Sequence, residues 1–173
     1  MVGVIDGFDL SRNNLSGVIP ADLCRLEALT HLNLSNNNLT GCLPKEIGNV
    51  QTLREILLAS NSLEGDIPES IGQLKDLEIL NLKGNKFTGN IPETIGNLNR
   101  LKHLDLSDNY LSGTIPDSLC DAEKMENVDF SSNRLSGSLP RNLQKLKALQ
   151  NFDASNNNIS GPVSDEFLCT VIL

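Results

Sequence analysis

Residues that could do acid–base or metal chemistry are few and far apart in this sequence. The only two histidines, His31 and His103, are widely separated along the chain. Catalysis needs titratable groups that converge on one point, and the spacing of the serines, histidines and acids predicts no nucleophile–base set. Four cysteines are present, and their spacing matches no zinc motif: Cys24, Cys42, Cys120 and Cys169. We therefore predict a protein without catalytic residues, metal ion or cofactor.

Three aspartates, Asp105, Asp129 and Asp153, form an acidic series with a regular spacing of 24 residues. If consecutive carboxylates lie about 4.8 Å apart, they repel each other by roughly 1 kcal/mol in water, so the row could attract a cation or a basic ligand. One carboxylate per repeat is a sparse set of ligands for calcium. We therefore favour the alternative that each aspartate forms hydrogen bonds within its own segment, such as LDLS at 104–107.

The regular spacing arises because the chain consists of seven units of 24 residues, without insertions or deletions. The units begin near residues 5, 29, 53, 77, 101, 125 and 149. The ninth position of every unit is an asparagine: Asn13, Asn37, Asn61, Asn85, Asn109, Asn133 and Asn157. The thirteenth position is always glycine, and six units carry proline at the sixteenth. We predict that the asparagines are structural, because an amide can satisfy backbone donors and acceptors where the chain turns.

Each unit predicts the same short structural elements. Apolar residues at positions 4 and 6 alternate with polar residues at 3, 5 and 7, which indicates a half-buried β-strand. One short strand cannot bury its apolar side alone, so the units must stack and their strands form a parallel sheet. The glycine at position 13 suits a left-handed backbone, and the segment after the proline is too short for an α-helix, which favours 3₁₀ turns.

The predicted stacking also sets the distances between equivalent side chains. At about 4.8 Å per layer, His31 and His103 lie about 14 Å apart, too far to share a metal ion or a proton. By the same reasoning Cys24 and Cys120 lie about 19 Å apart, far beyond the reach of a disulfide. We therefore expect all four cysteines to be free thiols.

The pattern LxxLxLxxNxLxGxIPxxIGxLxx resembles the plant-specific class of leucine-rich repeats and covers residues 5–168. The resemblance implies an α/β repeat solenoid, a curved horseshoe of seven 24-residue repeats with its parallel sheet on the concave face. It also implies short second strands, for example over residues 111–114, and 3₁₀ turns on the other sides. We expect residues 1–173 to form a single leucine-rich-repeat domain.

The composition argues against several classes of function. Fourteen Lys and Arg against 22 Asp and Glu give a net charge of −8, which disfavours binding to nucleic acid or to anionic membrane surfaces. No apolar run approaches the roughly 20 residues that span a bilayer, so we predict no membrane insertion by this segment. The start, MVGVIDGFDLS, lacks the features of a secretory leader.

The two ends of the repeat lack the polar caps that solenoids need for solubility. The first unit starts at residue 5, and the tail FLCTVIL is largely apolar. We expect an excised fragment, a truncated gene product or a designed array, with end-to-end self-association through the uncapped edges. The alternative is a natural short protein whose ends are covered by a partner.

Proteins of the resembled class are mostly ectodomains of receptor-like kinases and receptor-like proteins, or inhibitors of fungal polygalacturonases. The resemblance implies a non-catalytic module that binds a peptide or protein in signalling or defence, at the cell surface or outside the cell. Four N-x-S/T motifs agree with an extracellular location, although the repeat consensus generates such motifs by itself: Asn14, Asn33, Asn38 and Asn158. The alternatives are a structural or designed array without a ligand, a cytoplasmic scaffold with reduced thiols, and an inhibitor of a cell-wall-degrading enzyme.

Positions 2, 3, 5, 7 and 8 vary between units and are expected to face solvent on the concave sheet. Leu57 and Ile79, in the third and fourth units, are predicted to be exposed on neighbouring strands. An apolar centre with a charged rim is typical of a recognition patch, whereas scattered exposed aliphatic residues also occur without a function. The predicted ligand-binding residues are Arg54, Glu55, Leu57, Glu78, Ile79, Asn81, Lys83, Lys102, His103, Asp105 and Asp129. We expect a partner with an apolar anchor and a basic flank.

Overall fold

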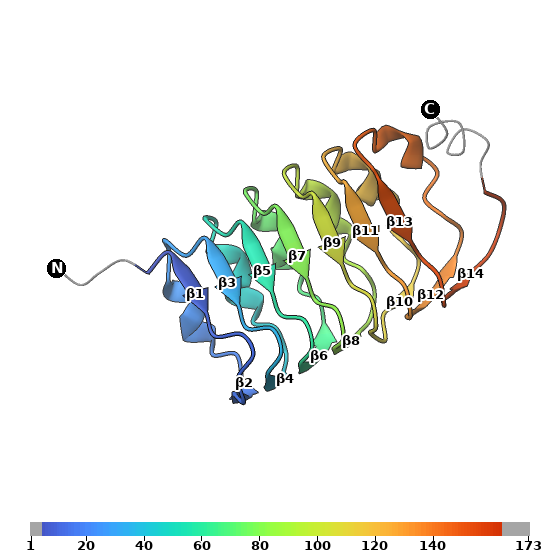
Figure 1. Cartoon of the computed structure of the whole chain (residues 1–173). Helices are drawn as coiled ribbons and strands as arrows, with labels where there is room; N and C mark the ends of the chain where they lie inside the picture. Colours follow the sequence, from blue (N-terminus) through green and yellow to red (C-terminus); the bar gives the residue numbers. More distant parts are fainter. Residues whose placement is uncertain (1–4, 164–173) are drawn as a thin grey trace.

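A computed structural model describes residues 5–163, and it shows a twisted row of similar coils stacked in chain order (Figure 1). Each coil contributes one strand to a seven-stranded parallel sheet, in which the strands follow one another in sequence order. These strands are β1 (Gly7–Asp9), β3 (His31–Asn33), β5 (Glu55–Leu57), β7 (Ile79–Asn81), β9 (His103–Asp105), β11 (Asn127–Asp129) and β13 (Asn151–Asp153). The predicted leucine-rich-repeat solenoid is therefore confirmed. The thiol of Cys169 and the apolar tail lie outside the described residues.

The alternation of side chains along these strands places one face in the core and the other in solvent. Ile56 and Leu80 are fully buried, while Glu55 and Leu57 on either side of Ile56 lie on the outer, concave face. The strands pair without an offset, so that residues 24 apart lie directly opposite each other, as Ile56 does with Leu80. A shift by one residue would turn the apolar side chains to water, and burial of the leucines therefore fixes this register.

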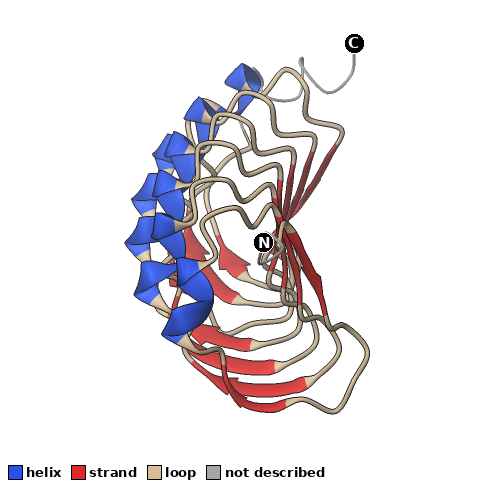
Figure 2. Ribbon diagram, turned by 90° about the vertical axis from the view of Figure 1, so that its left-hand side faces the viewer, coloured by secondary structure: helices blue, strands red, loops and turns tan. Residues whose placement is uncertain are grey.

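The opposite side of each coil is formed by short 3₁₀ turns (Figure 2). They are η1 (Ala21–Arg25), η2 (Lys45–Asn49), η3 (Glu69–Gln73), η4 (Glu93–Asn97), η5 (Asp117–Asp121) and η6 (Leu143–Lys145). A proline precedes each of the first five turns, because its fixed φ suits the entry into a helical turn. Hydroxyl groups connect successive turns: Thr94 Oγ1 donates to the Glu69 carbonyl at 2.7 Å, and Ser118 Oγ donates to the Glu93 carbonyl at 2.7 Å.

A second series of short strands runs along a third side of the coils, seen at the bottom of Figure 1. It forms a four-stranded and a three-stranded parallel sheet. The strands are β2 (Ser16–Val18), β4 (Asn38–Gly41), β6 (Ser62–Asp66), β8 (Lys86–Thr88), β10 (Ser112–Gly113), β12 (Arg134–Gly137) and β14 (Asn158–Ile159). The strand expected over residues 111–114 is thus limited to its two central residues. The repeated glycine lies at this side with φ between 71° and 95°, as its left-handed role requires.

The repeated asparagines bind each coil to the one before it. Asn37 Nδ2 donates to the Leu34 carbonyl of its own coil at 3.0 Å and to the Leu10 carbonyl of the preceding coil at 2.9 Å. Its Oδ1 accepts the backbone N–H of Leu15, again in the preceding coil, at 2.9 Å. The same three contacts recur at the five asparagines that follow: Asn61, Asn85, Asn109, Asn133 and Asn157. The side chain of Asn13, in the first coil, bonds only within its own coil.

Leucine and isoleucine fill the interior between these three sides, in one continuous apolar cluster from Ile19 to Leu146. Four aromatic rings interrupt the aliphatic pattern: Phe8 packs against the cluster, Phe87 is fully buried, and Phe130 and Phe152 meet edge to face with ring centroids 6.1 Å apart. Cys24 and Cys120 are buried in the same cluster, whereas Cys42 is exposed, and none of the three forms a disulfide. Burial raises the pKa of the Cys24 and Cys120 thiols, so it disfavours their reactive thiolate forms.

We predict that Asn85→Ala lowers the free energy of unfolding by about 3 kcal/mol, because it leaves buried backbone groups of two coils without partners. The matched change Asn13→Ala removes the same amide from an exposed residue whose side chain makes no bond to another coil. Asn13→Ala should lower the free energy of unfolding clearly less than Asn85→Ala does. Urea unfolding followed by circular dichroism measures both values. Equal losses for the two variants would contradict a role for the bonds between coils.

The cysteine environments predict selective reactivity. In a Cys169→Ser background, one thiol per chain should react quickly with a disulfide reagent in the folded protein, and it should be Cys42. The other two should react only after urea is added, because they are buried and their pKa values are raised. A Cys42→Ser control should abolish the fast phase. Rapid reaction of all three native thiols would contradict the described packing.

Candidate functional site on the concave sheet

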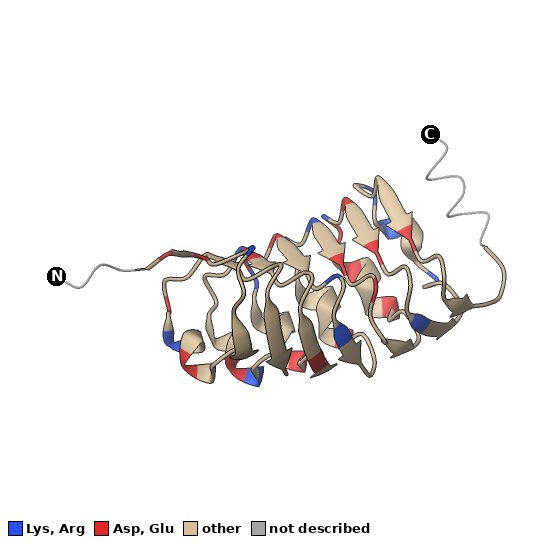
Figure 3. Ribbon diagram, turned by 60° about the horizontal axis from the view of Figure 1, so that its bottom comes forward, with Lys and Arg blue, Asp and Glu red and all other residues tan. Residues whose placement is uncertain are grey.

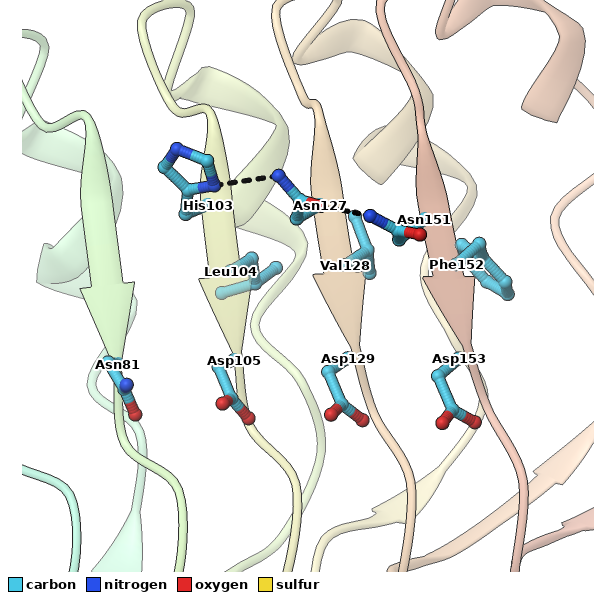
Figure 4. Close-up of a pocket in the computed structure, with 10 residues that line it drawn as sticks. All are labelled: Asn81, His103, Leu104, Asp105, Asn127, Val128, Asp129, Asn151, Phe152 and Asp153. Carbon is cyan, nitrogen blue, oxygen red and sulfur yellow. Dashed lines mark hydrogen bonds between the residues drawn. The ribbon is translucent and has the colours of Figure 1, made fainter.

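A polar depression with a volume of about 600 Å³ lies on the concave face of strands β9, β11 and β13 (Figure 4). Two rows of side chains cross it, one from the first residue of each strand and one from the third. The residues that line it are Asn81, His103, Leu104, Asp105, Asn127, Val128, Asp129, Asn151, Phe152 and Asp153. The depression exists because the register places residues 24 apart directly opposite each other across the sheet.

The first row is a hydrogen-bonded ladder across three strands. Asn127 Nδ2 donates to His103 Nδ1 at 2.9 Å, and Asn151 Nδ2 donates to Asn127 Oδ1 at 2.5 Å (Figure 4). An amide nitrogen can only donate, so this bond fits the His103 tautomer that carries its ring proton on Nε2. The ladder orders three side chains that would otherwise be mobile on an open sheet, so a ligand would meet a surface that is already ordered.

The second row consists of the three aspartates. Oδ1 of each accepts the backbone N–H of the serine two residues on: 3.0 Å for Asp105 and Ser107, 2.9 Å for Asp129 and Ser131, and 2.8 Å for Asp153 and Ser155. The bonds from Ser155 hold the pKa of Asp153 below its usual value. These local hydrogen bonds agree with the interpretation favoured above. Within residues 5–163, Oδ2 of the three carboxylates makes no hydrogen bond and remains open to a partner.

The same local bond occurs in six of the seven coils, with Asp or Asn as the acceptor at the third strand residue. The third coil is the exception, because Leu57 stands at this position and cannot accept a hydrogen bond. Among the described residues, no side chain accepts the N–H of Ala59 in its place. This coil has therefore given up a local stabilising contact for an apolar side chain on the concave face.

Leu57 and Ile79 lie on the neighbouring strands β5 and β7, and both point to the concave face. They are half-buried rather than exposed as expected, because the register places Asn81 directly opposite Leu57 and Glu55 directly opposite Ile79. The two side chains are diagonal neighbours across this pair of strands. Together they form an apolar step beside the polar depression.

Charged side chains at the entrance to the strands neutralise one another in a second ladder. Glu78 accepts a hydrogen bond from Lys102 Nζ at 2.7 Å and lies 3.4 Å from Arg54 Nη1. The bond from Lys102 lowers the pKa of Glu78, aided by the positive charges of Lys102, Arg54 and Arg100, and the same contact raises the pKa of Lys102. Lys83 is paired with Asp108 at 3.7 Å. The predicted charged rim is present, but its charges are largely paired.

Four of the predicted ligand-binding residues line the depression: Asn81, His103, Asp105 and Asp129. The remaining seven lie outside it, around the apolar step and the charged ladder: Arg54, Glu55, Leu57, Glu78, Ile79, Lys83 and Lys102. Sequence reasoning did not single out Asn127 and Asn151, which continue the row of His103. Their shared position in consecutive units was the signal that could have identified them.

Within residues 5–163, no group of three or more His, Cys, Asp or Glu side chains is placed to hold a metal ion. His31 Nε2 lies 3.9 Å from a carboxylate oxygen of Glu55, three strands away from His103. In the same part of the chain, no helix has the length and apolarity needed to cross a bilayer.

The stacked coils, the asparagine bonds and the open concave sheet define a leucine-rich-repeat solenoid. A family model described as "Leucine-rich repeat region" matches residues 8–128, and a second, "Leucine Rich Repeat", matches residues 124–146 and 148–169. The chain belongs to the leucine-rich-repeat family. A search of curated proteins finds no match.

Solved structures of plant receptor ectodomains are similar to this chain. The plant peptide hormone receptor RGFR1, solved in complex with RGF2, has a TM-score of 0.94 and 32% identity over 96% of this chain and 27% of its own. The Arabidopsis receptor kinase HAESA, solved with the peptide hormone IDA and the co-receptor SERK1, has a TM-score of 0.94 and 35% identity over 97% of this chain and 28% of its own. The chain thus spans about a quarter of the length of these receptors.

A smaller ectodomain matches over most of its own length. That of the receptor kinase SOBIR1 from Arabidopsis thaliana has a TM-score of 0.73 and 36% identity, over 78% of this chain and 74% of its own.

We predict that the pKa of Glu78 rises toward the ordinary glutamate value in a Lys102→Met variant, because the hydrogen bond from Lys102 is the main cause of its depression. The pair stabilises the folded protein when Glu78 is ionised, so this contribution is lost as the pH falls through the lowered pKa. Carboxylate NMR titration measures the shift. The control Lys147→Met also removes one positive charge, at a lysine that makes no contact with Glu78, and should leave the pKa of Glu78 unchanged. An unchanged Glu78 pKa in Lys102→Met would contradict this assignment.

Proposed function

We propose that this chain is a non-catalytic recognition module that binds an extended peptide, or an extended segment of a protein, along the concave face of strands β5 to β13. The observation that carries the proposal is the exception in the third coil. Six coils use the third strand residue to bond their own backbone, whereas the third coil places Leu57 there next to Ile79. Positions that break a local structural rule without a structural gain are expected at functional sites.

The surface along this face favours a partner of a particular chemistry. Leu57 and Ile79 offer an apolar step for an aliphatic or aromatic side chain, and apolar anchors contribute most of the affinity at such surfaces. The depression beyond them presents the free Oδ2 atoms of Asp105, Asp129 and Asp153. A partner with an apolar anchor followed by Lys or Arg residues complements both regions.

Similarity to receptors supports the same proposal from a second direction. RGFR1 and HAESA are described in complexes with peptide hormones, and both align over nearly the whole of this chain. We infer an extracellular or cell-surface location and a role in signalling or defence, with residues 1–173 acting as one leucine-rich-repeat domain.

The widely spaced histidines and the locally bonded aspartates give no basis for catalysis, and we propose that the chain is not an enzyme.

An extracellular location makes N-glycosylation part of the proposal. Asn14, Asn38 and Asn158 are exposed, at the same position of three coils. Asn33 lies in the main sheet, where its amide donates to Asp9 Oδ2 at 3.2 Å and its Oδ1 accepts the Ser35 N–H at 3.2 Å. We therefore propose the three exposed asparagines, and not Asn33, as the glycosylated sites.

The peptide proposal predicts the outcome of a selection from a phage-displayed library of random dodecapeptides on the immobilised protein. Enriched peptides should carry an apolar residue and a basic flank. A synthetic copy of an enriched peptide should bind the Leu57→Asn/Ile79→Asn variant at least about tenfold more weakly, because the apolar step is lost. Isothermal titration calorimetry gives the dissociation constants.

The variant and its control separate binding from folding. Asparagine occupies the equivalent positions elsewhere in this sheet, at Asn81 and Asn127, and it can restore the missing bond to the Ala59 N–H. The urea midpoint of the variant should therefore stay close to that of the parent. The control Val18→Asn/Val163→Asn makes the same exchange at two exposed residues elsewhere on the surface. Enrichment of the same peptides by parent and Leu57→Asn/Ile79→Asn, with equal affinity, would refute the proposed site.

A further inference from the structure

The outer faces of the first and seventh coils carry hydrogen-bonding groups that are paired at every junction between coils. At such a junction the asparagine Oδ1 accepts the N–H of position eleven in the preceding coil, as Asn37 does from Leu15 at 2.9 Å. In the described chain, Oδ1 of Asn13 in the first coil accepts no hydrogen bond. No side chain of that same part of the molecule accepts the N–H of Ile159 in the seventh coil, and the Ala154 carbonyl receives a side-chain bond only from the asparagine of its own coil. We call these two surfaces the first-coil face and the seventh-coil face.

Both faces expose apolar side chains at positions that are buried in the coils between them. At positions one and eleven the first coil carries Ile5 and Leu15, which are 47% and 38% exposed. Leu149 and Ile159, at the same positions of the seventh coil, are only partly buried. The residues at these positions in the second to sixth coils are all buried. Each face therefore presents to water the apolar surface that a neighbouring coil covers elsewhere.

The two faces also match each other in backbone and in shape. β1 and β13 are the edge strands of the main sheet, at opposite ends of the row of coils (Figures 1 and 3). At the junctions between coils the side chain of position fourteen covers the glycine of the next coil, as Asn90 does at Gly113. Among residues 5–163, nothing lies within 4 Å of the place that a Cβ would take on Gly17, and Pro162, at position fourteen of the seventh coil, is exposed. Pro162 of one copy can therefore cover Gly17 of another.

We infer that the seventh-coil face of one copy of this chain stacks on the first-coil face of a second copy, and that repetition of this contact forms head-to-tail oligomers. The bonds of an ordinary junction then recur between two chains. Asn13 Nδ2 of the second copy donates to the Ala154 carbonyl of the first, and its Oδ1 accepts the Ile159 N–H. Only the pairing of unlike faces places these groups as they lie at the junctions within one chain. Because unlike faces meet, each dimer keeps one free face of each kind, and association continues beyond two copies.

The forces at this contact predict an unusual dependence on salt. Release of water from the apolar side chains favours the contact, as it does between coils of one chain. Electrostatic repulsion opposes it, because each copy has a net charge of −8 and the register places Asp9 of one copy opposite Asp153 of the other. Added salt screens this repulsion and should strengthen association, whereas it would weaken an assembly held by ion pairs. The contact leaves the apolar step of Leu57 and Ile79 open, so the inference is independent of the peptide proposal.

Sedimentation equilibrium of the 173-residue protein, produced without glycans, tests the inference over a wide range of concentrations. The weight-average mass should rise with concentration past that of a dimer without reaching a plateau, and it should rise further when salt is added. A monomer at every concentration would overturn the inference. A plateau at the mass of a dimer would also overturn it, because that result indicates pairing of like faces.

Two variants each block one face with charged side chains, which prevent pairing at the edge of a sheet. Ile5→Arg/Leu15→Arg changes the first-coil face, and Leu149→Arg/Ile159→Arg changes the equivalent positions of the seventh-coil face. Each variant alone should associate at least about tenfold more weakly than the parent.

The control Asn38→Arg/Tyr110→Arg adds the same charge at two exposed residues of inner coils. Both lie at position ten, where the sixth coil carries Arg134. The control should associate within about twofold of the parent. Equal loss of association in the control and in the two end variants would contradict the assigned faces.

A mixture of the two end variants distinguishes a head-to-tail contact from a general loss of association. Each variant keeps the face that the other has lost, so the mixture should form a dimer with one copy of each variant and nothing larger. Sedimentation velocity with a dye on one variant measures this dimer. A mixture that remains monomeric, or that grows beyond a dimer, would overturn the inference.

Discussion

The hydrogen bonds from each repeated asparagine to the preceding coil are the constraint on which the rest of this structure depends. A coil of 24 residues is too thin to bury its own leucines, so it folds only against a neighbour. The asparagine side chain satisfies two carbonyls and one N–H where the chain turns away from the sheet. Because it reaches a fixed pair of groups in the coil before it, it also sets the register of the two coils. Burial of the leucines and pairing of the turns therefore favour the same alignment.

Fixed register determines what kind of site the molecule can build. Equivalent side chains meet only their counterparts one layer away, so they form rows. Such rows are His103, Asn127 and Asn151 in one case, and Arg54, Glu78 and Lys102 in another. A row can neutralise its own charges or share hydrogen bonds, but it does not surround a substrate on several sides. This geometry supports the proposed recognition of a partner along an extended face.

The 24-residue period was sufficient to predict the coils, the parallel sheet, the 3₁₀ turns and the left-handed glycines. It was not sufficient to predict which side chains pair within a row. Asn127 and Asn151 share a position with His103, yet only their rotamers decide that amide and imidazole bond to one another. The second series of strands pairs with an offset of two residues, as Ser112 does with Arg134. That offset places Arg134 opposite Ser112, and its side chain reaches back over the ring of Tyr110, a contact that the shared repeat position of Tyr110 and Arg134 alone does not predict.

The departures from the repeat exchange a hydrogen bond that stabilises the coil for an apolar side chain on the concave face. Each coil gains a local bond when its third strand residue is Asp or Asn, and a structural array without a ligand would gain stability by keeping that residue in every coil. The third coil instead carries Leu57 and leaves the Ala59 N–H without a side-chain acceptor. The neighbouring coil adds Ile79 beside it. Two adjacent coils that forgo polar residues on the same face are hard to explain by folding alone, because the core beneath them is already complete at Ile56 and Leu80.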